Sequence, residues 1–141
     1  MNHRTIRGKL LYLHDTRGET GREWFSVTVQ PSGERTVRAQ CEMEDKQVLR
    51  DVVWTMDAEW RPIDAYVRLS VGGTWQGSGW FQCADNLVTG EIQSAAAGRM
   101  HQRLELDQAP AIFGAHPVSG DAMKVAVFDH NGPPPSGLHG C

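Results

Sequence analysis

Two histidines are the residues whose surroundings best suit acid–base chemistry. His101 lies in an alternating segment between Arg99 and Arg103, and two neighbouring cations favour the neutral imidazole that accepts a proton. His116 precedes Asp121 by a few residues, and a carboxylate at that spacing can orient an imidazole for catalysis. A half-exposed strand histidine and an ordinary turn explain the same residues, so the catalytic and the structural interpretation both stay open.

A second group of side chains has the chemistry to hold a small organic ligand. Trp24, Tyr66 and Trp80 offer aromatic surfaces for stacking, and Arg68 and Arg103 can pair with an anionic group. All five lie in the polar phase of alternating segments, so we expect them on one face of a sheet. Aromatic rings among hydrogen-bonding groups are typical of a pocket that orients an organic molecule.

Other kinds of site find no support in the sequence. The histidines show no HxH or HExxH spacing, and Cys41, Cys83 and Cys141 form no CxxC motif, so we expect neither a metal nor a cofactor. There is no GxSxG nucleophile motif, and Cys41 and Cys83 share apolar strand faces, as buried inert thiols do.

Composition indicates one ordinary globular domain. The chain has 141 residues, with 14 Lys and Arg against 17 Asp and Glu, a formal net charge of −3. This charge argues against nucleic acid or an anionic membrane as the main partner. No apolar run approaches the roughly 18 residues that span a bilayer. The N-terminal segment also lacks the apolar core of a secretory signal, so we expect a cytoplasmic protein.

The elements that must position these side chains are strands, because apolar and polar residues alternate with a period of two along most of the chain. Turn residues divide the chain into about nine predicted strands: residues 5–14, 24–30, 34–44, 47–56, 63–71, 74–83, 87–94, 99–106 and 123–128. Residues 16–21 are expected to form a polar loop, and Gly72-Gly73 a two-residue hairpin. The prediction is an all-β fold, an antiparallel meander curled into a barrel or half-barrel. The barrel domain covers residues 1–130, and a flexible tail rich in Pro and Gly covers residues 131–141.

Two arrangements of such a sheet are open. The apolar face can fill the interior while the mixed polar and aromatic face meets water, or the mixed face can line a cavity; we expect the cavity. Gly77 and Gly79 inside the strand at 74–83 predict a bend or bulge. Aromatic side chains of a neighbouring strand would fill the space that these glycines leave.

The first two-thirds of the chain also carries a resemblance. The run Glu23-Trp24, Gly33 and Cys41, followed by residues 53–57, Trp60-Arg61-Pro62 and residues 66–69, resembles bacterial lipocalin-like (calycin-type) domains. The resemblance implies a barrel with one internal ligand site and no cofactor, and it transfers no active-site residue.

The leading hypothesis is therefore a β-barrel that binds a small, partly apolar organic ligand, aromatic or carboxylate-bearing, in an internal cavity. The alternative is a cofactor-independent lyase, isomerase, cyclase or hydratase that uses His101 or His116 as its acid or base. The second alternative is a homodimeric interaction module that buries one sheet face against its partner. Neither nucleic acid nor a membrane is expected as a partner.

Overall fold

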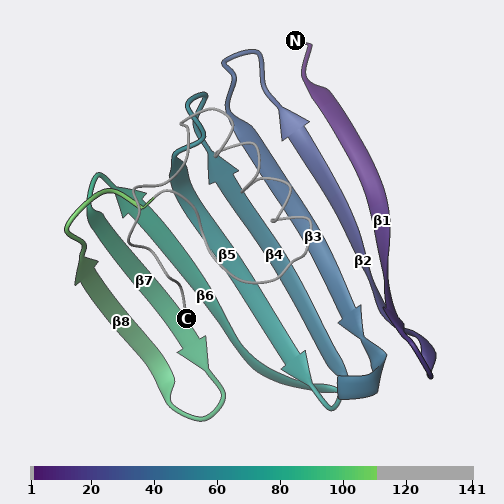
Figure 1. Ribbon diagram of the computed structural model, residues 1–141. Coiled ribbons are helices and arrows are strands. Elements are labelled where there is room, and N and C mark those ends of the chain that lie inside the picture. Colours follow the sequence, from purple (N-terminus) through teal and green to yellow (C-terminus); the bar gives the residue numbers. More distant parts are fainter. Residues whose placement is uncertain (1, 111–141) are drawn as a thin grey trace.

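The computed structural model describes residues 2–110, which form one sheet of eight antiparallel strands (Figure 1). The strands are β1 (Arg4–His14), β2 (Gly18–Val29), β3 (Arg35–Met43), β4 (Val48–Met56), β5 (Pro62–Val71), β6 (Thr74–Ala84), β7 (Leu87–Ser94) and β8 (Gly98–Glu105), with a 3-10 turn η1 (Glu44–Lys46) between β3 and β4. Each strand pairs with the next in sequence. The predicted all-β antiparallel meander is confirmed, whereas the ninth predicted strand at 123–128 and the predicted tail lie outside the described residues.

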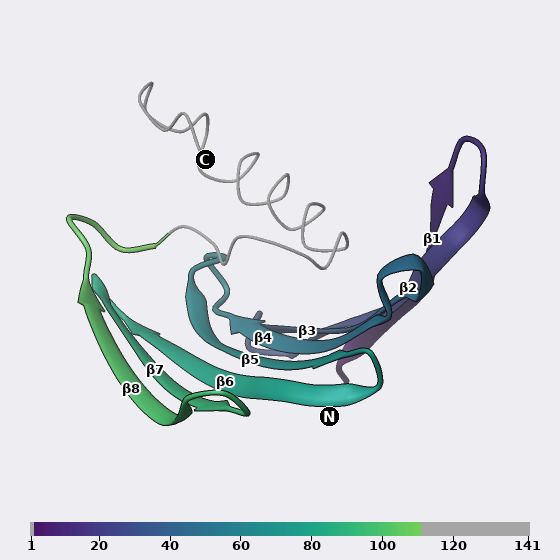
Figure 2. The ribbon, with the colours of Figure 1, turned by 90° about the horizontal axis from the view of Figure 1, so that it is seen from below.

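The sheet is strongly bent, and β1 and β8 form its two edges (Figure 2). Within residues 2–110 these two edge strands do not pair with each other. The described part of the chain is therefore an open, curved sheet, and its closure into a barrel stays a prediction.

Two predicted turns have different outcomes. The hairpin at Gly72-Gly73 is confirmed, because both residues have the positive φ angles, 59° and 75°, that a tight strand connection needs. The loop predicted at residues 16–21 is wrong for residues 18–21, since the turn covers residues 15–17 and β2 already begins at Gly18. The pairing of β1 and β2 continues past an irregularity at Tyr12, whose carbonyl oxygen accepts a 3.1 Å hydrogen bond from the Thr20 hydroxyl.

The predicted irregularity near Gly77 and Gly79 is confirmed, since the register of β5 and β6 shifts between Leu69 and Ser70. At Gly79 the aromatic ring that fills the space comes from β6 itself and not from a neighbouring strand, whereas at Gly77 a Cβ atom would lie 2.8 Å from the backbone oxygen of Gln93. A Cβ atom at Gly79 would lie 2.9 Å from the Phe81 ring. On β7, a Cβ atom at Gly90, which is directly opposite Phe81, would lie 3.1 Å from the same ring.

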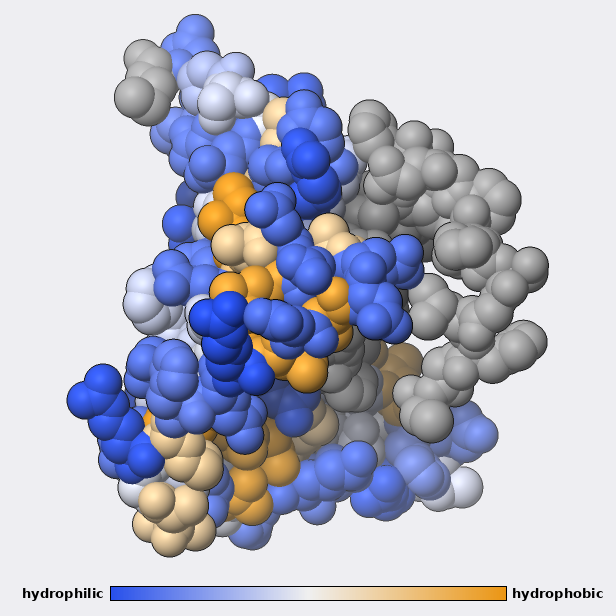
Figure 3. Space-filling model, turned by 90° about the vertical axis from the view of Figure 1, so that its left-hand side faces the viewer, coloured by the Kyte–Doolittle hydropathy of each residue, from blue (hydrophilic) through white to orange (hydrophobic). Residues whose placement is uncertain are grey.

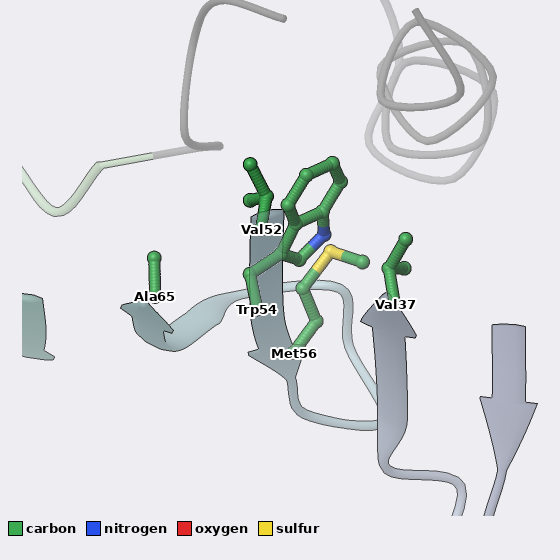
Figure 4. Packing of buried hydrophobic residues seen from close by; sticks show 5 residues of the cluster. All are labelled: Val37, Val52, Trp54, Met56 and Ala65. Carbon is green, nitrogen blue, oxygen red and sulfur yellow. The ribbon is translucent and has the colours of Figure 1, made fainter. Parts of the chain in front are cut away.

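The core lies on the concave side of the sheet. Its buried residues come from the three central strands β3, β4 and β5 and all point to that side (Figures 2 and 4): Val37, Val52, Trp54, Met56 and Ala65. Val27, Trp60 and Val67 pack against this cluster. Seen from the β8 side, the surface is mostly hydrophilic and its hydrophobic residues gather near the middle (Figure 3).

The turn between β4 and β5 is fixed by side chains. One carboxylate oxygen of Asp57 accepts hydrogen bonds from the backbone N–H groups of Glu59 and Arg61, at 2.9 and 2.8 Å. The Arg35 guanidinium lies 3.9 Å from the centre of the Trp60 ring and donates to the Asp57 carbonyl oxygen at 2.9 Å. These contacts hold Trp60 at a φ of 66°, a conformation that a bulky residue rarely adopts.

Candidate functional site

The mixed polar and aromatic face is the convex face of the sheet. Its large aromatic residues are open to solvent, with Trp24 47%, Tyr66 41% and Trp80 44% exposed. The apolar face lies on the concave side and contains the buried core. Within residues 2–110 three of the predicted ligand-binding residues, Trp24, Tyr66 and Trp80, therefore line shallow surface depressions instead of an enclosed cavity. Arg68 and Arg103 do not line these two depressions.

One depression lies over Ser78 on β6, and we call it the Ser78 hollow. It has a volume of about 210 Å³, and its lining residues include Tyr66, Ser78, Trp80, Gln93 and Arg99. Tyr66 is directly opposite Trp80 in the pairing of β5 and β6. Ser78 is short, and its longer neighbours on β5, β6 and β7 surround it, which leaves the surface hollowed at this point.

The far wall of the Ser78 hollow contains a carboxylate that sequence reasoning missed as a partner of His101. His101 Nδ1 lies 2.7 Å from Glu91 Oε1, and Arg99 lies 3.6 Å from the other oxygen. The hydrogen bond with His101, together with the charges of His101 and Arg99, lowers the pKa of Glu91. The two cations predicted from the sequence are therefore not the whole environment of His101, because antiparallel pairing also places Glu91 directly opposite it.

The two predicted anion-binding arginines differ in their surroundings. Arg68 is exposed beside the Ser78 hollow, opposite Ser78 in the register, and among residues 2–110 it forms no ion pair. Arg103 lies opposite Thr89, one row of this face beyond the pair of Glu91 and His101, and it pairs with Glu105 at 3.0 Å. Of the two, only Arg68 lies beside the hollow without an ion pair among the described residues, and Asp51 on β4 is directly opposite it in the register.

Trp24 lies apart from the other predicted site residues. It is on β2, three strands from Tyr66 on β5, which corresponds to about 14 Å at the usual strand spacing. The structure therefore divides the predicted site into two places on the same face. His116 and Asp121, the other predicted catalytic residues, lie outside the described residues.

On the opposite face, a buried cluster of polar groups was also missed. Glu23 is 0% exposed, and its carboxylate accepts a 2.7 Å hydrogen bond from the Tyr12 hydroxyl. The Cys41 thiol lies 3.7 Å from the same oxygen. A signal was present in the sequence: Glu23 occupies the apolar phase of its strand, two residues before Phe25.

Neither described cysteine has the environment of a nucleophile. Burial, followed by the charge of Glu23, raises the pKa of Cys41 to about 11. Burial also raises the pKa of Cys83. Both thiols are therefore protonated at neutral pH, which matches the inert role expected from the sequence.

Neither a metal site nor a membrane-spanning helix is found among the described residues. No three His, Cys, Asp or Glu side chains within residues 2–110 are grouped so that they could hold a metal ion. The same residues contain no helix of the length and apolarity that a membrane crossing requires. Comparisons of the chain with protein-family models, curated proteins and solved structures found no match.

Proposed function

We propose that this protein binds a small organic molecule that carries an aromatic ring and a carboxylate, and that it does so at the Ser78 hollow. The observation that carries this proposal is the exposed pair of Tyr66 and Trp80, which lie directly opposite each other on neighbouring strands. Beside them is the guanidinium of Arg68, which forms no ion pair with any described residue. Rings that remain open to solvent next to polar groups are suited to stacking on a planar ligand. The proposal moves the ligand from the predicted internal cavity to an open face.

Each wall of the hollow has a role in this complex. The ligand ring stacks on Trp80, whose indole N–H donates to Asp64 at 3.4 Å and so has a fixed orientation. The ligand carboxylate accepts hydrogen bonds from Arg68 and from the Ser78 hydroxyl, with charge assistance from the arginine. Gln93, which is opposite Ser78 on β7, offers an amide to a further polar group of the ligand.

The test is a titration with benzoate, followed through the indole N–H resonances in two-dimensional NMR spectra. We expect a saturable shift of the Trp80 resonance, assigned by its loss in Trp80→Phe. Arg68→Gln should weaken binding about fivefold, the loss expected for a solvent-exposed, charge-assisted hydrogen bond. Arg38→Gln, a matched change on β3 away from the hollow, should leave the benzoate affinity unchanged. A Trp80 resonance that does not move, or an equal loss in both arginine variants, would refute the proposal.

A second candidate function has its own observation, the 2.7 Å contact between His101 Nδ1 and Glu91. This contact holds the imidazole in one orientation and leaves Nε2 for proton transfer at the edge of the hollow. A cofactor-independent lyase, isomerase, cyclase or hydratase would use this pair on a ligand that the hollow binds. His101→Gln should then abolish turnover of that ligand, while benzoate binding persists. If the turnover of the ligand is unchanged in this variant, the enzymatic function is rejected.

Barrel closure, an internal cavity, a cytoplasmic location and the absence of nucleic-acid or membrane partners stay predictions. The homodimer does too, and light scattering tests it, since a protein that is monomeric at all concentrations would exclude it.

A further inference from the structure

A second depression lies over Ser26 on β2, and we call it the Ser26 hollow. It has a volume of about 410 Å³, and its lining residues include Arg7, Trp24, Ser26, Arg38 and Gln40. Ser26 is opposite Arg7 on β1 and opposite Arg38 on β3. A short side chain between two long ones produces this hollow, as Ser78 does at the other site.

The composition of the two hollows is related. Each has a serine at its floor and a tryptophan two residues away on the same strand: Trp24 with Ser26, and Trp80 with Ser78. Each serine also has an arginine opposite it on a neighbouring strand. The Ser26 hollow differs in the number of its cations, because both strand neighbours of its serine are arginines.

Positive charge predominates in the Ser26 hollow, which has two arginines and one acidic residue, Asp51, in its lining. Among residues 2–110, neither Arg7 nor Arg38 forms an ion pair, and Arg38 contacts only a neutral group, the Thr28 hydroxyl at 3.4 Å. Lys9 adds a third positive charge, with its ammonium 4.6 Å from the centre of the Trp24 ring. Lys9 thus lies against the exposed indole of Trp24, while Arg7 and Arg38 line the hollow on either side of Ser26, in a chain whose net charge is −3.

The spacing of the two arginines suits one anion held between them. Their strands are two steps apart in the sheet, or about 10 Å between backbones. A guanidinium extends several ångströms from its backbone, so both can reach an anion above the Ser26 hydroxyl. Planar guanidinium groups bind phosphate through paired hydrogen bonds.

We propose that the Ser26 hollow binds a phosphate monoester of an aromatic or other planar molecule. The phosphate lies over Ser26 between Arg7 and Arg38, and the planar group stacks on the exposed face of Trp24. Two arginines that form no ion pair within residues 2–110, together with a lysine, match the double negative charge of a phosphate monoester better than the single charge of a carboxylate. Asp51 is the acidic residue at the rim; it lies on β4, opposite Gln40, and therefore beyond the pair of arginines.

The experiment is a titration of the intact protein with phenyl phosphate, monitored through the indole resonance of Trp24, which Trp24→Phe identifies. Phenyl phosphate should shift this resonance saturably. Benzyl alcohol, which keeps the ring without the charge, and inorganic phosphate, which keeps the charge without the ring, should each bind at least tenfold more weakly. Raising the salt concentration should weaken phenyl phosphate binding, because exposed charges are screened.

Matched variants separate this site from the Ser78 hollow. Arg7→Gln and Arg38→Gln should each weaken phenyl phosphate binding about tenfold, the usual cost of one charge-assisted contact to a phosphate. Arg68→Gln, the same change at the other hollow, should have no effect. Equal binding of inorganic phosphate and phenyl phosphate would overturn the role of Trp24, and insensitivity to both Arg7→Gln and Arg38→Gln would overturn the site.

The outcome does not depend on the proposed function of the Ser78 hollow. Benzoate reports on Trp80 and Arg68, whereas phenyl phosphate reports on Trp24 and Arg38. If phenyl phosphate moves only the Trp80 resonance, the second site is refuted while the first stands. If benzoate fails and phenyl phosphate shifts the Trp24 resonance, the reverse holds.

Discussion

Removal of one hydroxyl group should show how much the hydrogen bond between Tyr12 and the buried Glu23 contributes to the free energy of unfolding. The Tyr12 hydroxyl donates a 2.7 Å hydrogen bond to the Glu23 carboxylate, which is 0% exposed. Tyr12→Phe deletes this donor and keeps the ring. A hydrogen bond to a charged, buried acceptor contributes about 1.5–3 kcal/mol. For a chain of this size, a loss of about 2 kcal/mol corresponds to a decrease in Tm of about 6–8 °C.

The measurement is urea unfolding at neutral pH, with Tyr66→Phe as the matched control. Tyr66 is the other tyrosine of the chain; its ring is exposed, and the structure shows no hydrogen bond from its hydroxyl to another described residue. We expect a lower unfolding midpoint for Tyr12→Phe with an unchanged slope, and no shift for Tyr66→Phe. The slope matters because a changed slope would indicate an altered denatured state.

The pH dependence provides an independent check on the same contact. Burial, and after it the hydrogen bond with Glu23, raises the pKa of Tyr12 above its ordinary value of 10.0. The neutral phenol therefore stabilises the fold fully below about pH 10, where the unfolded chain also keeps its proton. Above that pH the unfolded chain ionises first, so the wild-type protein loses stability that Tyr12→Phe never had. The difference between the two proteins should shrink as the pH rises beyond 10. A constant difference, or equal losses in the two tyrosine variants, would refute this account of Glu23.

Three further substitutions follow from single contacts. Gly8→Ala would place a Cβ atom into the Phe25 ring and should destabilise the protein by about 1–3 kcal/mol; urea unfolding measures this, and Phe25→Leu should restore part of the loss. Asp57→Ala removes the acceptor that fixes the β4–β5 turn and should lower the Tm by about 3–5 °C in calorimetry, unless the turn forms without it. Glu91→Gln removes a negative charge from the Ser78 hollow and releases its ion-pair partners, Arg99 and His101. Benzoate should then bind about two- to threefold more tightly at constant ionic strength. Weaker binding of benzoate would show that Glu91 positions His101.

The antiparallel meander was predictable because the information that specifies it is local. Alternation with a period of two assigns each residue to a face, and glycine pairs such as Gly72-Gly73 mark the connections. A meander needs nothing else, since each strand pairs with its neighbour in sequence. The start of β2 was missed because residues 16–21 are polar and rich in Gly, while their pairing with β1 depends on the position of a strand irregularity that no local pattern specifies.

For the candidate site, the sequence predicts only which face of the sheet its residues occupy. Alternation placed Trp24, Tyr66, Arg68 and Trp80 on one side of the sheet, and the structure agrees. It does not specify which side is concave, because curvature arises from the twist and packing of the whole sheet. Alternation also says nothing about separation across strands, so Trp24 was grouped with residues that lie three strands away.

The register of the strands determines which side chains of the mixed face are neighbours, and so where its separate hollows form. Once strands are aligned, a short residue such as Ser26 or Ser78 becomes a hollow, because its neighbours on both sides are long. The charges around each hollow also depend on register, since pairing sets Glu91 opposite His101 in one case and Arg7 and Arg38 on either side of a serine in the other. The first arrangement neutralises part of its positive charge internally, whereas the two arginines of the second form no ion pair within residues 2–110. The same residue types on the same face should therefore select ligands of different charge.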